Sequence, residues 1–401
     1  MTASTNFPTI STPRPAIRLE SGDASTATAP QARVKGSSRA ADDPLDVKLI
    51  RARELSAEDT AAWSEIQRRN PALDSPFFRP EFTQAVASVR DEVEVAILQK
   101  DGRPFGFFPF HRTREGVAQA VARRLSDLHG VVVAEEARWS PVKLIEGCGL
   151  RAWYFDHLIQ SQSPMQPFHW RLLESPYLDL RAGFEAYAED LRVRGSRQLN
   201  QVLRKTRKLG REVGRVRLEV HEESDLAFEL LQEWKAEQYR RTRRLNTFDY
   251  DWVIELLDRI RATQTEEFRG VLSVLYAGDR IASVHLGIRS QRVLHWWFPT
   301  YSRELAQYSP GLILLTELAK AAESLGVERI DLGRGDERYK GSLSNGAFLI
   351  AEGAVDRRPV RRTVWRTWHA CKMGIRNSRF RPVLEVPLNA SRRLREWAMF
   401  R

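Results

Sequence analysis

Ionisable and hydrogen-bonding side chains are concentrated between residues 331 and 340 of this 401-residue chain. This segment reads Asp-Leu-Gly-Arg-Gly-Asp-Glu-Arg-Tyr-Lys and follows a run typical of a strand. Its carboxylates, phenol and amine can accept, donate and carry charge within a short distance. The imidazole of His285, on an earlier predicted strand, would add a further group able to move protons. The pattern predicts a site where these groups meet.

Three apolar runs are predicted to position this site. They cover residues 271–276, 281–288 and 293–298 and are separated by Ala-Gly-Asp-Arg and Arg-Ser-Gln-Arg, which are typical of short hairpin turns. The pattern predicts an antiparallel meander. Four residues of the middle strand share the expected core face: Ala282, Val284, Leu286 and Ile288. Ser283 and His285 would then point to a face that can line a cleft.

A helix over residues 312–325 follows the meander, and Gly326 is placed to end it. Ser309 can cap its first turn, Pro310 suits the first helical position, and Gly311 lets another group approach the backbone. A helix start of this kind can bind a phosphate or carboxylate. The alternative is an ordinary helix start with no ligand.

Two strings in this region resemble the GNAT superfamily, and in particular the CelD-like acyltransferases of polysaccharide loci, which are related to FemAB-type transferases. The strings are Tyr308-Ser309-Pro310-Gly311 and Asp331-x-Gly333-x-Gly335-Asp336-x-x-Tyr339-Lys340. The usual GNAT pyrophosphate loop is not found between Arg303 and Leu312. Acyl-CoA as the donor is therefore implied by the resemblance and not by that motif.

The resemblance implies an α/β fold with tandem GNAT-like domains, each a mixed, mostly antiparallel sheet flanked by helices. A hairpin over residues 93–110 echoes the one over 271–288, and each follows two predicted helices. We therefore expect four segments: a disordered tail (1–45), a degenerate acceptor-side domain (46–180), a catalytic domain (181–356) and a basic amphipathic C-terminal segment (357–401).

The resemblance also implies roles in acyl transfer to an amine, without a covalent enzyme intermediate. Asp331 or Asp336 would be the general base, with His285 as an alternative. Tyr339 would protonate the leaving group, and Lys340 would neutralise the oxyanion or a phosphate.

The remaining predicted site residues hold the donor and the acceptor. Six are assigned to the donor: Tyr308, Ser309, Pro310, Gly311, Gly333 and Gly335. Three are assigned to substrate: Arg204, Trp297 and Tyr301.

Each assignment has a structural alternative. Asp331 and Lys340 can form an internal ion pair, the glycines can simply make a turn, and His285 can be a scaffold residue. The basic stretch from 192 to 217, which includes Arg204, is either a solvated helix face or a phosphate-binding rim. Asp127 and His129, two positions apart, are expected to be solvated loop side chains rather than a cleft pair.

Composition limits the partners and the compartment. A formal charge of +11 favours acidic partners such as nucleotide phosphates, an anionic lipid surface or nucleic acid. Two cysteines are too few for a disulfide framework, and there is no metal-ligand spacing, so no metal is expected. No signal peptide is recognised, which favours the cytoplasm. The 357–401 segment would either contact a membrane surface peripherally or pack on its own domain.

These observations lead to three hypotheses. The first is an N-acyltransferase that moves an acyl group from acyl-CoA to an amino group of a sugar or envelope precursor. The second is a FemAB-like aminoacyltransferase that uses aminoacyl-tRNA, the only setting in which nucleic acid is expected. The third is a non-catalytic basic adaptor at the membrane surface.

Overall fold

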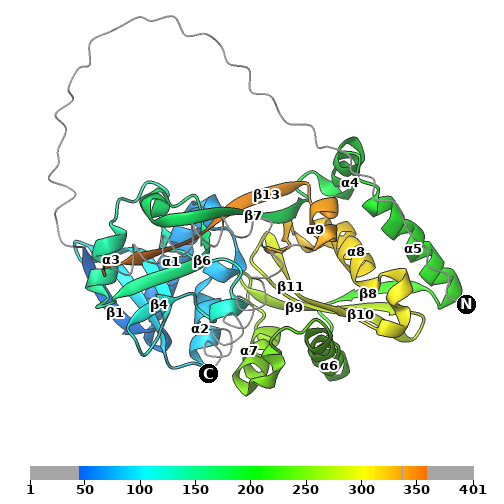
Figure 1. The fold of residues 1–401 in the computed structure, drawn as a ribbon, viewed down its shortest axis with the longest axis horizontal. Coiled ribbons are helices and arrows are strands. Elements are labelled where there is room, and N and C mark those ends of the chain that lie inside the picture. The colour runs from blue at the N-terminus through cyan, green and yellow to red at the C-terminus, as the bar shows by residue number, and fades with distance from the viewer. Residues whose placement is uncertain (1–44, 336, 359–401) are drawn as a thin grey trace, which may run out of the picture. The chain divides into compact units, whose positions relative to one another are not determined.

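Helices and strands alternate through the part of the chain that the computed structural model describes, residues 45–335 and 337–358 (Figure 1). The N-terminal half contains β1 (Asp46–Arg51), α1 (Ala57–Arg69), α2 (Pro80–Ala87), β2 (Val93–Lys100), β3 (Arg103–Arg112), β4 (Val117–Gln119), β5 (Val132–Val133), α3 (Pro141–Gly147), β6 (Ala152–Ile159) and β7 (His169–Asp179). The C-terminal half contains α4 (Gly183–Val193), α5 (Gln198–Glu212), β8 (Val216–Val220), α6 (Asp225–Arg241), α7 (Asp251–Ala262), β9 (Arg269–Ala277), β10 (Arg280–Arg289), β11 (Val293–Tyr301), α8 (Pro310–Leu325), β12 (Arg329–Asp331), α9 (Arg338–Leu343) and β13 (Gly346–Asp356).

The two halves repeat one arrangement, as the paired hairpins predicted. β1, α1, α2, β2 and β3 correspond in order to β8, α6, α7, β9 and β10. In each half the first strand pairs antiparallel with the second, and the second pairs antiparallel with the third. The fold is thus α/β and tandem, with a mixed, mostly antiparallel sheet flanked by helices.

One continuous sheet joins the halves, in the order β1-β2-β3-β4-β6-β13-β7-β12-β11-β10-β9-β8. The last strand, β13, lies between β6 and β7 and pairs antiparallel with both. Strands from the two halves therefore alternate at the centre of the sheet. The domain boundary at residue 180 stays a prediction, but β7 and β13 hydrogen bond across it.

Different helices cover the two faces of the sheet in the C-terminal half (Figure 1). Helices α6 and α7 pack with the Val284, Leu286 and Ile288 side of β10 in a core that extends to α1 and α2. Helices α4, α5 and α8 pack on the opposite side, in a core that includes Ala282. Ala282 was expected on the same face as Val284; a register shift between Ile281 and Ser283 moves it to the other face.

The local signals account for several element ends. The Ser56 hydroxyl caps α1 by accepting from the Asp59 amide. Gly326, with φ of 68°, ends α8, where a left-handed residue is needed. The basic stretch was expected to be one helix, but α4 ends at Val193, α5 begins at Gln198, and β8 follows.

Candidate functional site

β11 and β12 separate where the polar segment begins. They pair in parallel only from Val293 opposite Arg329 to His295 opposite Asp331. β11 continues to Tyr301, whereas the chain leaves β12 after Asp331. Beyond His295, β12 no longer covers that edge of β11. A strand edge of this kind can bind an extended ligand through its backbone groups.

A carboxylate–imidazole pair lies at the point of separation. His295 Nε2 on β11 is 2.9 Å from Oδ2 of Asp127, a loop residue of the other half. The His295 side chain is 3% exposed and that of Asp127 is 31% exposed. Since an ionised carboxylate only accepts hydrogen bonds, Nε2 carries a proton, which leaves Nδ1 as the ring nitrogen that can accept one.

Neighbouring charges keep Asp127 ionised. Burial alone would raise its pKa, but the hydrogen bond from His295 and the charges of His295, His157 and Lys340 outweigh burial and lower the pKa. Asp127 therefore does not behave as a solvated loop residue. His129 is 8% exposed, and burial lowers its pKa to about 4, so the expectation of two solvated side chains was wrong.

The loop after β12 packs directly on this pair. Gly333 has φ of 66°, and a β-carbon there would lie 2.9 Å from Asp127 Oδ2 and 3.3 Å from His295 Cε1. Lys340 Nζ donates to the carbonyls of Gly333 and Arg334, each at 3.2 Å, and lies 3.4 Å from Glu337 Oε2. The predicted glycine and lysine therefore shape one loop against Asp127 and His295.

We predict that Gly333→Ala disturbs the pair and destabilises the fold. The added methyl group meets the Asp127 carboxylate, and alanine disfavours the left-handed backbone by about 1 kcal/mol or more. Urea denaturation measures the stability loss. Gly102→Ala, which also has positive φ but no atom within 4 Å, is the matched control for backbone strain alone. If the two substitutions lower the free energy of unfolding by the same amount, close packing of Gly333 on Asp127 makes no contribution to stability.

Helix α6 adds a buried amine and a phenol. Lys235 is 7% exposed, and its Nζ donates to the Pro299 carbonyl of β11 at 2.8 Å. Burial and the charges of Arg244 and Lys340, opposed by Glu337, lower the pKa of Lys235 to about 7. Burial raises the pKa of the Tyr239 phenol, and the negative charge of Asp127 acts in the same direction. We call Asp127, Lys235, Tyr239, His295 and Lys340 the junction site.

The start of α8 differs from the expected capped helix. Ser309 is left-handed, with φ of 57°, and its side chain makes no capping bond. Its Oγ instead accepts from Lys205 Nζ of α5 at 2.7 Å. The Tyr308 phenol donates to Glu212 of α5 at 2.8 Å. The basic helix α5 therefore places a cation at the first turn of α8, beside Pro310 and Gly311.

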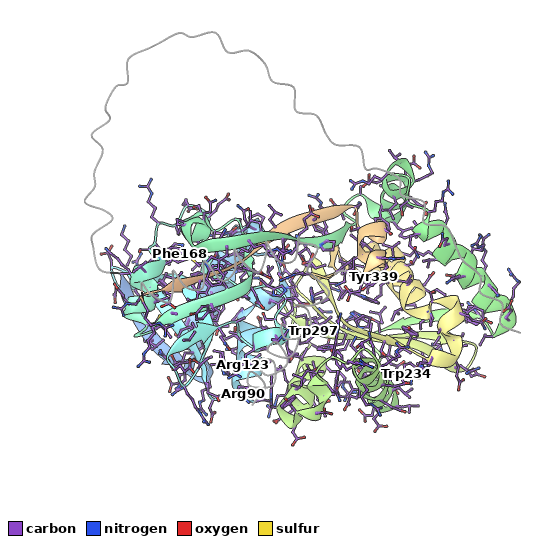
Figure 2. All side chains as sticks on the ribbon, viewed as in Figure 1. Arg90, Arg123, Phe168, Trp234, Trp297 and Tyr339 are labelled. Carbon is purple, nitrogen blue, oxygen red and sulfur yellow. The ribbon has the colours of Figure 1, made fainter. Side chains whose placement is uncertain are left out.

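Asp331 forms an internal ion pair, one of the expected alternatives, but its partner is Arg329 rather than Lys340. Asp331 is 2% exposed, and Arg329 Nε donates to Oδ1 at 2.7 Å. Tyr339 lies on α9 (Figure 2), and burial raises the pKa of its phenol, which is hydrogen bonded to Trp296. Asp336 lies outside the described residues.

His285 does not line a cleft, because it is completely buried. Its ring stacks on Trp296 with centroids 4.0 Å apart, and Nε2 accepts from the Trp297 amide at 3.3 Å. Burial and the charges of His295 and Lys235 lower the pKa of His285 well below its usual value. The expectation of an accessible imidazole on this face was wrong.

The predicted substrate residues are dispersed. Trp297 lies between the halves (Figure 2), where its indole donates to the Leu125 carbonyl at 2.8 Å within the core. Tyr301 is half-buried near Gly311 at the end of β11, and Arg204 is exposed on α5. Gly335 packs beside Glu337 and Lys340. A cavity of about 800 Å³, lined by residues that include Arg197, Gln201 and Ser342, contains none of the junction-site residues.

Sequence reasoning missed His295 and Lys235. His295 lies within the third apolar run, and the pattern gave no reason to prefer it over His285. The available signal for Lys235 was its spacing from Ala227, Phe228 and Leu231 on one helical face, because lysine is rarely buried without a function or partner. Asp127 was noticed, but its partner is 168 residues away.

The comparisons with known proteins agree with this architecture. Residues 196–341 match the family model of an acetyltransferase (GNAT) domain. No curated protein sequence matches the chain. FemX has a similar structure, with a TM-score of 0.53 and 9% identity over 80% of this chain and 100% of FemX.

Two further solved structures have lower TM-scores. The C-terminal domain (DUF2156) of a putative lysylphosphatidylglycerol synthetase from Agrobacterium fabrum has a TM-score of 0.48 and 13% identity over 81% of this chain and 98% of its own. A tandem GNAT protein from the clavulanic acid biosynthesis pathway has a TM-score of 0.44 and 8% identity over 78% of this chain and 99% of its own. Residues 196–341 thus match a GNAT acetyltransferase domain, within a tandem fold similar to that of FemX.

Proposed function

We propose that this protein is an N-acyltransferase that transfers an acyl group from acyl-CoA to an amino group of a sugar or cell-envelope precursor. The observation that carries the proposal is the Asp127–His295 pair at the point where β11 and β12 separate. The pair places a base with a fixed tautomer beside a strand edge able to hold an extended donor. The match of residues 196–341 to a GNAT acetyltransferase domain supports the same reaction.

The donor would bind from the α8 side of the sheet. Lys205 supplies a cation at Ser309, where the amides and dipole of the α8 N-terminus favour a phosphate group. The remainder of the donor would extend along β11 towards His295. This path places the thioester carbonyl near the junction site, with the CoA phosphates outside it.

The junction site and the nearby segment of Tyr339 would supply the groups that the reaction needs. His295 Nδ1 would take the proton of the attacking amine while Asp127 holds the ring and stabilises its charged form. The amine nitrogen would bond to the thioester carbon, and backbone amides at the β11 edge would stabilise the oxygen as it becomes negative. The carbon–sulfur bond then breaks, and the thiolate accepts a proton from a group such as the Tyr339 phenol.

A donor screen tests this proposal. We expect CoA thioesters to raise the melting temperature of the purified protein, because a ligand at a hundredfold excess over its Kd stabilises by about 2.7 kcal/mol. Lys205→Ala should weaken donor binding without loss of fold, since Lys205 is half-buried at the α8 start. Lys320→Ala, on the exposed C-terminal part of α8, is the matched control. No thioester binding by the wild-type protein would contradict the proposal.

A second candidate is aminoacyl transfer from aminoacyl-tRNA. It is favoured by the exposed basic face of α5, which carries Arg204, Arg207, Lys208 and Arg211. Contacts with several phosphates would make tRNA binding fall steeply with salt concentration. Tight, salt-dependent tRNA binding together with no thermal shift from CoA thioesters would favour this second function.

A further inference from the structure

Two buried lysines bind the chain segments that diverge where β11 and β12 separate, Lys235 at Pro299 of β11 and Lys340 at Gly333 and Arg334 after β12. They come from different sides of the sheet. Lys235 belongs to α6, which packs in the core shared with α1 and α2. Lys340 belongs to α9, whose Tyr339 and Leu343 pack in the opposite core with α8. The two residues are 7% and 8% exposed, and the charge of Lys340 contributes to lowering the pKa of Lys235.

The described residues balance the positive charge of Lys340 but not that of Lys235. Lys235 Nζ has the Pro299 carbonyl as its hydrogen-bond partner and no ion pair with a described carboxylate. Lys340 has two carbonyls and Glu337 at 3.4 Å as partners, and the ionised Asp127 carboxylate also interacts with its charge. Arg244 adds a third positive charge near Lys235. Burying an ammonium without a counter-charge costs several kcal/mol, so a ligand that supplies negative charge would be strongly favoured here.

We propose that Lys235 and Lys340 form a binding seat for a negatively charged group, a phosphate or a carboxylate, carried by the acyl acceptor. This inference rests on the proposed acyltransferase function and specifies its substrate class. The acceptor would be an anionic amine whose negative group is fixed between the two ammonium groups. Its amino group would then face His295.

The position of Lys235 favours the acceptor over the donor as the source of this charge. The donor's phosphates are assigned to the α8 start, which Lys205 reaches from α5, a helix that packs in the other hydrophobic core. Lys235 reaches the β11 edge from α6, in the core on the opposite face. One donor phosphate cannot occupy both places, so a second anionic molecule is needed to fill the seat.

The seat should weaken as pH rises above 7. Lys235 is faced by Arg244 of the α6–α7 connection, Glu337 and Lys340 of the 333–343 segment, His285 of β10 and Tyr239 of its own helix. With a pKa of about 7 in the free protein, Lys235 loses its charge above neutral pH. Anion affinity should therefore fall up to about tenfold per pH unit above 7, until the higher pKa of the bound state is reached.

Isothermal titration with inorganic sulfate and with acetate, at constant ionic strength, tests the seat. Sulfate represents a phosphate and keeps its charge from pH 6 to 9, whereas acetate represents a carboxylate. The anion that binds with the lower Kd identifies the negatively charged group as a phosphate or as a carboxylate. We expect Lys235→Met to weaken that binding by about tenfold or more, and Lys48→Met, on the exposed face of β1, to leave it unchanged.

Two further variants separate charge from other effects. Lys235→Gln can still donate to the Pro299 carbonyl but carries no charge, so it should also lose anion binding. Asp336→Asn should leave binding unchanged; a marked gain in affinity would identify Asp336 as the counter-charge and overturn the inference. Equal anion affinity in the wild-type protein and Lys235→Gln would overturn it as well. Thermal melts verify that each variant is folded.

Acyl-transfer assays distinguish this inference from the proposed function. We expect an amino sugar that carries a phosphate or carboxylate to react with a lower KM than the neutral form, and Lys235→Gln to abolish that difference. Efficient transfer to the neutral amine with no preference would refute the anionic acceptor and leave the function standing. Lys235-dependent anion binding without any thioester binding or transfer would refute the function and leave the seat standing.

Discussion

Replacing His295 with alanine is expected to lower the rate of acyl transfer by about 10²–10⁴-fold, the usual contribution of a positioned general base. The imidazole is held in one orientation by Asp127 at 2.9 Å and packs against the Phe77 ring, with centroids 4.8 Å apart. Without it the attacking amine would lose its proton acceptor, while the donor site at the α8 start would remain. The loss should therefore appear in kcat and leave donor binding, measured by thermal shift, nearly unchanged.

Asp127→Asn provides the sharper test of the same arrangement. The asparagine amide can donate to the ring nitrogen and stabilise the wrong tautomer, so the rate should fall even though the side chain keeps its size. His169→Ala, a half-buried histidine on β7 away from the junction site, serves as the control and should retain activity. A His295→Ala protein with wild-type kcat would exclude His295 as the base.

The sequence predicted most elements because their signals are local. The meander of β9, β10 and β11 follows from alternation and turn composition, and α8 from its apolar spacing and Gly326. The repeat of two halves was also visible, in two hairpins that each follow two helices. Local patterns did not reveal that β13 lies between β6 and β7, because that pairing joins residues about 170 to 200 positions apart.

The site was predicted less well, for reasons that particular residues illustrate. Gly333 packs on Asp127 and His295, and Lys340 donates to the Gly333 carbonyl, so part of the 331–340 segment contacts this pair; its catalytic role stays a prediction. His285 was preferred because alternation placed it on the face opposite the apolar residues, but helices cover both faces and bury it. The His295–Asp127 pair depends on packing between the halves, which a pattern within one segment cannot show.

Replacing Arg329 with methionine is expected to destabilise the protein by about 3–5 kcal/mol, because it leaves the Asp331 carboxylate buried without a partner. Arg329 donates to Asp331 at 2.7 Å and to the Asp74 carbonyl at 2.6 Å, so it links β12 to the N-terminal half. Urea denaturation measures the loss. Arg280→Met, which removes an exposed ion pair with Glu304, should cost no more than about 1 kcal/mol.

Substituting Asp331, the ion-pair partner of Arg329, decides whether Asp331 has a structural or a catalytic role. If the carboxylate serves only Arg329, Asp331→Asn should lower stability but leave kcat close to wild type once the protein is folded. If Asp331 is the general base that the sequence suggested, the same change should lower kcat by about 10²–10⁴-fold with the fold intact. The ion pair with Arg329 favours the first result, because the guanidinium already donates to both oxygens of this buried carboxylate. A folded Asp331→Asn protein without activity would return the role of base from His295 to Asp331.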